Sequence, residues 1–289
     1  MNNLYGEILK TLNLFIRFLK KMISINKKYL INLFLSNDSI KKKELIIIGL
    51  GPGDPSLLTI AAVDAIKKST LVAYPISNQG GKSIAAEIAS NWIKNKPQIP
   101  LLFPMENNSD ILRNAWNIAA EKLRSEIIKG NRVVFISQGD ISLFSTGSYI
   151  MLTLASKFPE LSIKLIPGVT SLSAASAIGR YPLIMQNEQL LISSVPDNPK
   201  EFEEIIIESF KYNRVIAFLK IGIRWVWVKS ILEKKGLLHS SLFAQRVGFP
   251  DQIVLPASEI SDDSKPYFSL LIVRKSWPLK SPEHLSIYL

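Results

Sequence analysis

The sequence of 289 residues contains no cysteine and only two histidines, His239 and His284. The absence of cysteine excludes disulfides, iron–sulfur clusters, cysteine zinc sites and thiol nucleophiles. Because both histidines come late in the chain, the histidines that a metal centre or a Ser–His triad needs are missing from the rest of it. We therefore expect no metal site, and since nothing indicates secretion, we expect a cytoplasmic protein.

Long hydrophobic runs are also lacking. Residues 1–43 combine bulky apolar residues with lysines, but no run approaches the ~18 residues of a membrane span, and no compact signal-peptide core is present. We therefore expect no stable membrane insertion. Two hypotheses remain for this segment: a poorly ordered basic extension, or an amphipathic helix on a membrane or on the protein body. The second rests on apolar residues at helical spacing, namely Leu9, Leu12, Phe15, Ile16, Leu19 and Ile23.

Positive charge is concentrated in the same segment. The net charge is +11, and residues 1–43 hold nine Lys and Arg against Glu7 and Asp38, which amounts to +7. The mildly basic remainder has no repeat that combines aromatic and basic residues, so it suits an anionic small molecule as readily as a polynucleotide. We expect no nucleic-acid partner. A basic module for nucleic acid or membrane is the alternative from another class, and the extension is its sole support.

From Glu44 onward, short apolar runs alternate with helical patterns, which is typical of βα units and a mostly parallel sheet. The predicted strands lie near Leu45–Ile48, Leu71–Tyr74, Ile99–Phe103, Arg132–Ile136 and Ser162–Ile166. The predicted helices lie near Ser56–Lys68, Lys82–Lys94, Ser109–Ile128 and Thr146–Ser156, and a further helix starts at Thr170. These elements make one complete α/β domain.

A second set of elements follows the break at "GRYPLIMQNEQ". It predicts strands near Leu190–Ser194, Arg214–Leu219, Ser241–Val247 and Tyr267–Val273, with helices near Lys200–Lys211 and Trp225–Lys235. The spacing indicates a smaller α/β domain with some antiparallel strands. We place the extension at residues 1–43, the N-terminal α/β domain at 44–182 and the C-terminal α/β domain at 183–289.

Two glycine-rich loops imitate nucleotide-binding motifs without completing them. "GLGPGD" begins as G-x-G after a strand, but Asp54 stands where a dinucleotide fingerprint has its third glycine. The second strand also ends in Tyr74-Pro75, whereas that fingerprint has an acidic residue there. "NQGGKS" resembles the end of a P-loop, but Ile76 stands where that motif requires its first glycine. Neither a dinucleotide nor ATP is therefore the expected ligand.

Three unusual loops follow the first, fourth and fifth predicted strands: "GLGPGD", "SQGDISLFSTGSY" and "IPGVTSLSAASA". In a parallel sheet these loops leave from the carboxyl edge, where such folds bind ligands. We expect them to form one pocket. It would hold a cofactor mainly through backbone groups and hydroxyls, because the loops carry no histidine, serine elbow or phosphate-binding lysine.

These loops, with "AYP", "FPM", "FLKIGIRWVWV", "RVGFPDQ" and "PYFSLLIV", resemble the tetrapyrrole methylases, in colinear order over roughly Leu45–Arg274. That family transfers a methyl group from S-adenosylmethionine to macrocycles on the routes to cobalamin and sirohaem. The resemblance implies its two-domain fold, with a mostly parallel five-stranded N-terminal sheet and a mixed C-terminal sheet, and a homodimer. It points to the branch that methylates C-20 of precorrin-2 or cobalt-precorrin-2. Another tetrapyrrole methylase, such as one acting on uroporphyrinogen III, is the alternative.

The resemblance also implies an S-adenosylmethionine site between the two domains. Its residues come from the three loops and from two loops of the second domain. They are Gly51, Pro52, Gly53, Gly139, Asp140, Ile141, Thr170, Ser171, Ile221, Val247 and Gly248. Ile221 stands where relatives often have methionine, and Ile141 replaces a proline of many members, which leaves the geometry of the second loop open.

The implied substrate is a reduced tetrapyrrole with eight carboxylates, so cationic side chains should surround it. Arg224 and Arg246, which lie inside matching motifs, are the first candidates for binding it, followed by Lys220 and Arg180. The candidates for a catalytic base are Asp140, Tyr149 and Asp251, with a turn cap or a core position as the structural alternative for each. At most one of Trp225 and Trp227 would offer flat surface to the macrocycle, because residues two apart on a helix face different ways.

Overall fold

The structure is a computed structural model that describes residues 43–106 and 108–276. These residues belong to a compact unit, Lys43–Leu289, which is distinct from residues 1–42. The predicted extension over residues 1–43 therefore lies, apart from Lys43, outside the described residues. Within the described ranges, none of the helices combines the length and the apolar character that crossing a bilayer requires.

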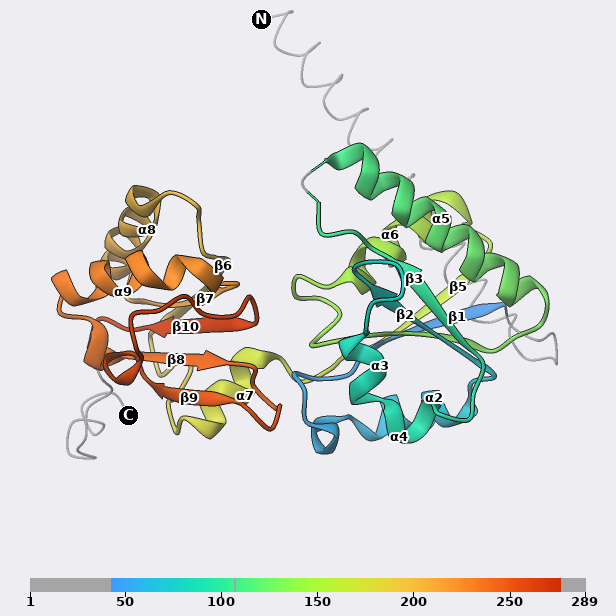
Figure 1. The fold of residues 1–289 in the computed structure, drawn as a ribbon, viewed down its shortest axis with the longest axis horizontal. Coiled ribbons are helices and arrows are strands. Elements are labelled where there is room, and N and C mark those ends of the chain that lie inside the picture. The colour runs from blue at the N-terminus through green and yellow to red at the C-terminus, as the bar shows by residue number, and fades with distance from the viewer. Residues whose placement is uncertain (1–42, 107, 277–289) are drawn as a thin grey trace, which may run out of the picture. The chain divides into compact units, whose positions relative to one another are not determined.

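The first sheet has five strands in the order β3-β2-β4-β1-β5, and every neighbouring pair is parallel (Figure 1). Its strands are β1 (Glu44–Gly49), β2 (Leu71–Ile76), β3 (Gln98–Leu102), β4 (Val133–Ser137) and β5 (Ser162–Ile166). All five were predicted from short apolar runs, and the parallel arrangement of this sheet is confirmed.

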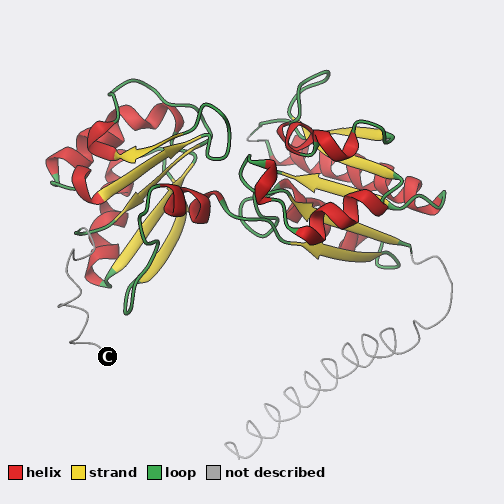
Figure 2. Ribbon diagram, turned by 90° about the horizontal axis from the view of Figure 1, so that it is seen from below, coloured by secondary structure: helices red, strands yellow, loops and turns green. Residues whose placement is uncertain are grey.

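Helices cover both faces of this sheet (Figure 2). On one face, α5 (Ser109–Ile128) and α6 (Thr146–Lys157) pack against the strands. The other face is covered by α2 (Ile60–Lys68), α3 (Ile84–Ile88) and α4 (Ser90–Ile93). A sheet covered on both faces needs strands that are apolar throughout, which explains the uninterrupted run in β1.

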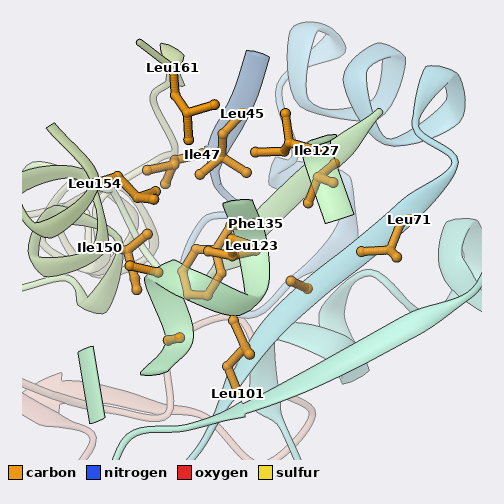
Figure 3. Packing of buried hydrophobic residues seen from close by; sticks show 14 of the residues in the cluster. Leu45, Ile47, Leu71, Leu101, Leu123, Ile127, Phe135, Ile150, Leu154 and Leu161 are labelled. Carbon is orange, nitrogen blue, oxygen red and sulfur yellow. The ribbon is translucent and has the colours of Figure 1, made fainter. Parts of the chain in front are cut away.

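The core under α5 and α6 shows how the strand alternation builds this packing (Figure 3). Leu45 and Ile47 point to this face, whereas Ile48 belongs to the cluster on the opposite face. Leu123 of α5 and Leu154 of α6 are fully buried against the strands. Burying each such side chain contributes about 1.5–3 kcal/mol relative to leaving it exposed.

Two predicted helices differ from the observed ones. The helix expected over Ser56–Lys68 begins only at Ile60, because Asp54 caps a single 3-10 turn, η1 (Pro55–Leu57), and Thr59 then caps α2. The hydroxyl of Thr59 accepts from Ala62 N at 3.1 Å. The helix expected over Lys82–Lys94 is divided into α3 and α4 by Ala89, whose ψ of 3° leaves the helical range.

The second sheet also has five strands, in the order β6-β7-β10-β8-β9. The β6–β7 pair is parallel and the other three pairs are antiparallel, so the predicted mixed sheet is confirmed. Its elements are β6 (Gln189–Ser194), α8 (Pro199–Lys211), β7 (Arg214–Leu219), η2 (Gly222–Arg224), α9 (Trp225–Lys234), η3 (Leu238–Ser240), β8 (Ser241–Gln245), β9 (Ile253–Pro256), η4 (Ala257–Glu259) and β10 (Ser269–Val273). Sequence analysis missed β9, a four-residue edge strand that ends in proline.

Helix α7 (Ser171–Ile178) follows the last strand of the first sheet but packs on the second sheet. Leu172 and Ala175 share a buried cluster with Ala217, Leu242 and other residues of that sheet. The opposite face of the second sheet packs against α8 and α9. The second sheet is therefore also covered on both faces, and it takes one of its helices from the segment before the predicted boundary.

A buried ion pair holds the segment between the two sets of strands. Arg274, just after β10, is 4% exposed and pairs with Glu188, which is 20% exposed. Its Nε donates to Glu188 Oε1 at 2.9 Å, and another guanidinium nitrogen donates to the carbonyl of Pro182 at 2.7 Å. The hydroxyl of Tyr181 donates to Ser240 O at 2.7 Å, and burial raises the pKa of that hydroxyl above its usual range. These contacts fasten residues 181–188 to the second sheet.

We expect Arg274→Met to lower the free energy of unfolding by about 3–5 kcal/mol, because it leaves the Glu188 carboxylate buried without its partner. Urea denaturation measures this change. Lys157→Met, which removes an exposed pair with Glu121, is the matched control and should lose less than about 1 kcal/mol. The double variant Arg274→Met/Glu188→Gln should recover part of the loss. Equal losses in the variant and the control would contradict this assignment.

Candidate functional site

The three loops expected to form a pocket leave from adjacent strands. They follow β4, β1 and β5, which lie side by side in the first sheet in that order. Because these strands are parallel and in register, their carboxyl ends meet at one edge. The topology therefore brings the three loops together, as the sequence predicted.

Glycine backbones form the contact among these loops. Gly51 and Gly139 form an antiparallel bridge in which Gly51 N donates to Gly139 O at 3.1 Å and Gly139 N donates to Gly51 O at 2.7 Å. A Cβ placed on Gly49 would lie only 2.7 Å from both Gly139 O and Gly168 N. No residue with a side chain fits at Gly49 without moving backbone, so we name Gly49, Gly139 and Gly168 the glycine junction.

Asp140 ties the second loop to the third. Its Oδ2 accepts from Gly168 N at 2.9 Å, and its Oδ1 accepts from Ser142 N at 2.9 Å and from the Ser142 hydroxyl. Burial raises the pKa of the Asp140 carboxyl, but these donors outweigh burial, and the pKa is lowered overall. A carboxyl with a depressed pKa stabilises the fold above its unfolded pKa and loses that contribution as the pH falls through the folded value. At neutral pH Asp140 is therefore ionised, and both of its carboxylate oxygens accept hydrogen bonds.

The first loop also contacts the loop after β8. A Cβ on Gly248 would lie 2.5 Å from Asp54 N and 3.0 Å from the Cα of Gly53, and Gly248 has a φ of +85°. On the other side of the loop, Gln138 Nε2 donates to Pro52 O at 2.9 Å. The structure thus gathers the predicted cofactor residues of three loops, residues 51–53, 139–140 and 247–248, into one set of backbone contacts.

The chemistry of these residues fits a cofactor held by backbone groups. The side chains of Ile141, Ile221 and Val247 are buried in the surrounding cores, so a ligand in this region would not meet them. A Cβ on Gly139, whose φ is +73°, would meet nothing within 4 Å, which leaves open space beside the glycine junction. Thr170 caps α7, its hydroxyl accepting from Ser173 N at 3.1 Å, and Ser171 begins that helix.

The predicted substrate cations are not equivalent. Arg246 pairs with Asp251 through Nε, at 2.8 Å to Oδ1 and 2.7 Å to Oδ2. Arg224 Nε donates to Asp197 Oδ1 at 2.8 Å. In the part of the chain that the structure describes, Lys220 and Arg180 form no ion pair, and Arg180 lies exposed just after α7.

Backbone strain coincides with the same positions. Among the described residues, six other than glycine have positive φ, and four of them lie at candidate positions or in their loops: Phe144, Arg180, Lys220 and Arg246. Such conformations cost about 1–3 kcal/mol each and persist where surrounding contacts require them. They are concentrated at functional sites, so this coincidence supports the choice of loops.

The other predicted residues fall outside the glycine junction. Tyr149 lies on α6 and stacks on Trp116 of α5, with ring centroids 4.5 Å apart. For Asp251, the hydrogen bond from Arg246 lowers the pKa, so this carboxyl is a weak base. Trp225 is fully buried and Trp227 packs against Phe202, so the expectation that one of the two tryptophans faces the macrocycle has no support in these positions.

Sequence analysis missed several residues of this region. Gly168 was quoted within its motif but not singled out, although its place after the fifth strand was a usable signal. Three half-exposed aromatic residues, Phe144, Tyr267 and Phe268, also lie in the quoted motifs, but their exposure could not be read from the sequence. Within residues 43–106 and 108–276, no group of three or more Asp, Glu or His side chains is placed to hold a metal ion.

Comparison with known proteins identifies the family to which the chain belongs. Residues 44–260 match the model of the Tetrapyrrole (Corrin/Porphyrin) Methylases, and the chain is a member of that family. The resemblance inferred from the loops is therefore confirmed, and with it the fold class.

The chain aligns with two named relatives over nearly the whole length of each relative. The cobalt-precorrin-2 C(20)-methyltransferase of Salmonella typhimurium is 28% identical over 81% of this chain and 97% of its own. The precorrin-2 C(20)-methyltransferase of a Sinorhizobium species is 25% identical over 79% of this chain and 94% of its own. Among solved structures, the uroporphyrin-III C-methyl transferase of Thermus thermophilus complexed with S-adenyl homocysteine shares the fold, with a TM-score of 0.54, 19% identity, and coverage of 80% of this chain and 97% of that one.

We expect Gly248→Ala to disrupt the contact between the first loop and the loop after β8, because its Cβ would displace the backbone at Asp54. Gly80→Ala is the matched control, since Gly80 has a similar φ of +74° but nothing within 4 Å of its Cβ. The control should lose about 1–2 kcal/mol of stability from φ strain alone, and Gly248→Ala about 1–3 kcal/mol more. Urea denaturation and amide hydrogen exchange at residues 51–54 measure both effects. Equal behaviour of the two variants would refute the contact.

Proposed function

We propose that the protein is an S-adenosylmethionine-dependent C-methyltransferase that methylates C-20 of precorrin-2 or cobalt-precorrin-2 in corrin ring biosynthesis. The observation that carries the proposal is the glycine junction, which joins three backbone-rich loops at the carboxyl edge of β4, β1 and β5. The family and the C(20)-methyltransferase names of relatives that align over nearly their whole length support it.

S-adenosylmethionine supplies an electrophilic methyl group on a sulfonium. We propose that residues 51–53, 139–141, 170–171, 221 and 247–248 hold it, mainly through main-chain groups. Methyl transfer is an in-line displacement by an electron-rich carbon, so the task of the protein is to align two reactants and to exclude water. Tight packing of glycine backbones supports this role because it fixes the loops to one another.

The three candidates for a catalytic base receive different proposed roles. Asp140 is a positioning residue, because its carboxylate accepts from Ser142 and Gly168 and has a lowered pKa. Asp251 holds Arg246 in place. Tyr149 lies on α6 and stacks on Trp116 of α5. The lowered pKa of each of the two carboxyls does not favour proton acceptance near neutral pH.

Two observations favour precorrin-2 over uroporphyrinogen III as the proposed substrate. The chain aligns with relatives named for precorrin-2 over almost their entire length at 25–28% identity. The motifs "KIGIRWVWV" and "RVGFPDQ" in the loops after β7 and β8 point to the same branch. Because these loops carry the predicted substrate cations Lys220, Arg224 and Arg246, they are the segments through which substrate choice would be made.

We further propose that the protein acts in the cytoplasm as a homodimer, as the family resemblance implies, and that sedimentation equilibrium of the full chain will give twice the chain mass of 32.4 kDa. A sedimenting mass of one chain would refute the dimer.

The predicted domains at 44–182 and 183–289 remain a proposal. The packing of α7 on the second sheet supports moving their boundary to a position before Ser171.

The function is tested with purified protein, methyl-labelled S-adenosylmethionine and precorrin-2, with and without inserted cobalt. We expect one labelled methyl at C-20, located by mass and carbon-13 spectra, and activity retained by Gly80→Ala but lost by Gly248→Ala. Label at another ring carbon would assign the protein to a different methylase, and the absence of label on either substrate would refute the proposal.

A further inference from the structure

The environment of Lys220 differs from that of the other predicted substrate cations. Its Nζ lies 5.1 Å from the ring centroid of Phe144 and 6.0 Å from that of Tyr267. Arg224 of the same loop and Arg246 of the loop after β8 each pair with an aspartate. Within residues 43–106 and 108–276, no carboxylate lies within ion-pair distance of Lys220, so aromatic rings are the described partners of its charge.

The backbone holds Lys220 and Phe144 in place. Both adopt left-handed conformations, with φ of +61° and +50°, which bulky side chains rarely adopt. The peptide after Lys220 is fixed by β10, because Ile221 N donates to Ser269 O at 3.2 Å and Gly222 N donates to the Ser269 hydroxyl at 3.2 Å. The fold therefore sets the backbone from which the Lys220 side chain starts, and the two rings lie beside the ammonium at its end.

The rings beside Lys220 are open on one side. Phe144 is 50% exposed and Tyr267 is 41% exposed. Tyr267 also packs edge-to-face on Phe268, with centroids 5.3 Å apart, and the carbonyl of Phe268 accepts from Arg246 N at 2.8 Å. Exposed rings at the start of β10 thus lie between the loop that carries Lys220 and the loop that carries Arg246.

The difference between a ring and a carboxylate as partner decides what Lys220 can bind. An ammonium over an aromatic face is attracted by the ring quadrupole, but it keeps its full charge. A carboxylate partner would neutralise that charge and compete with any anionic ligand. Held by rings, the Lys220 ammonium can donate a charge-assisted hydrogen bond to a carboxylate, while the open ring faces offer apolar surface to a flat macrocycle.

We propose that Lys220 binds a peripheral carboxylate of the tetrapyrrole, and that Phe144 and Tyr267 are positioning residues that fix its ammonium. The inference rests on the proposed function and extends it to two aromatic residues. Phe144 lies in the same loop as Asp140, so its contact with Lys220 links the loop of the glycine junction to the cation that receives the substrate.

The first test replaces the charge. Lys220→Met should raise the KM for precorrin-2 about tenfold, because one charge-assisted contact is lost, while kcat and the Kd for S-adenosylmethionine stay within about twofold. The wild-type KM should rise with ionic strength, and this dependence should be weaker in the variant. Lys200→Met removes an exposed lysine of α8 and is the matched control, with wild-type kinetics expected. An unchanged KM in Lys220→Met would overturn the proposal.

The second test replaces the ring. Phe144→Leu keeps apolar volume but removes the ring face, so the KM should rise about threefold, and Phe144→Tyr should restore it. Tyr212→Leu is the matched control, because it removes a ring under Arg214 at 4.8 Å on the surface. A purely structural role for Phe144 would instead lower the melting temperature and the S-adenosylmethionine affinity together, and that result would overturn the positioning role.

A binding assay separates this inference from the proposed function. Uroporphyrin, a macrocycle with a carboxylate on every peripheral side chain, is titrated against the full chain in the presence of S-adenosylhomocysteine and followed by fluorescence. We expect weaker binding to Lys220→Met and Phe144→Leu than to wild type and to both controls. Lys220-dependent binding by a protein that methylates no precorrin-2 would uphold the inference and refute the function. Equal binding by all variants would refute the inference alone.

Discussion

The close approach of Gly49, Gly139 and Gly168 is the constraint on which the rest of the site depends. A Cβ on Gly49 would lie 2.7 Å from backbone atoms of the other two, so these loops meet only because side chains are absent. Hydrogen bonds then fix the arrangement, through the bridge between Gly51 and Gly139 and through the Asp140 carboxylate on Gly168 N. A ligand beside this junction would meet main-chain groups, so the proposed site needs neither a cysteine nor a histidine.

The sheet order explains why these loops were predictable. Each begins where an apolar strand ends, and parallel strands place all such ends at one edge. What sequence analysis could not supply was the partner of each charged side chain. Asp197 is 27 positions from Arg224, and nothing in either motif indicates that they pair. Lys220 was grouped with both arginines because the three share a charge and similar motifs, whereas the structure separates them by the partner each one has.

Helix α7 illustrates a second limit of sequence analysis. Its small and apolar residues predict a helix after β5, and the helix is present, but periodicity does not say against which sheet it packs. A Cβ on Gly179 would lie 2.7 Å from the side chain of Leu242, a residue of β8, so the end of α7 is tightly packed on the second sheet. The fold class was predictable from alternating elements, whereas the assignment of α7 depended on contacts more than 60 residues apart.

The division of labour among charged residues follows from the same contacts. Asp140, Asp251 and Glu188 each accept from donors that hold a loop or a linker. Carboxylates engaged in this way are effective anchors, since each fixes backbone that has no regular secondary structure. Only a cation without such an anchor can bind an anionic substrate without first giving up an internal ion pair. Among the described cations of the β7 and β8 loops, Lys220 meets that condition, because aromatic rings and not a carboxylate lie beside its ammonium.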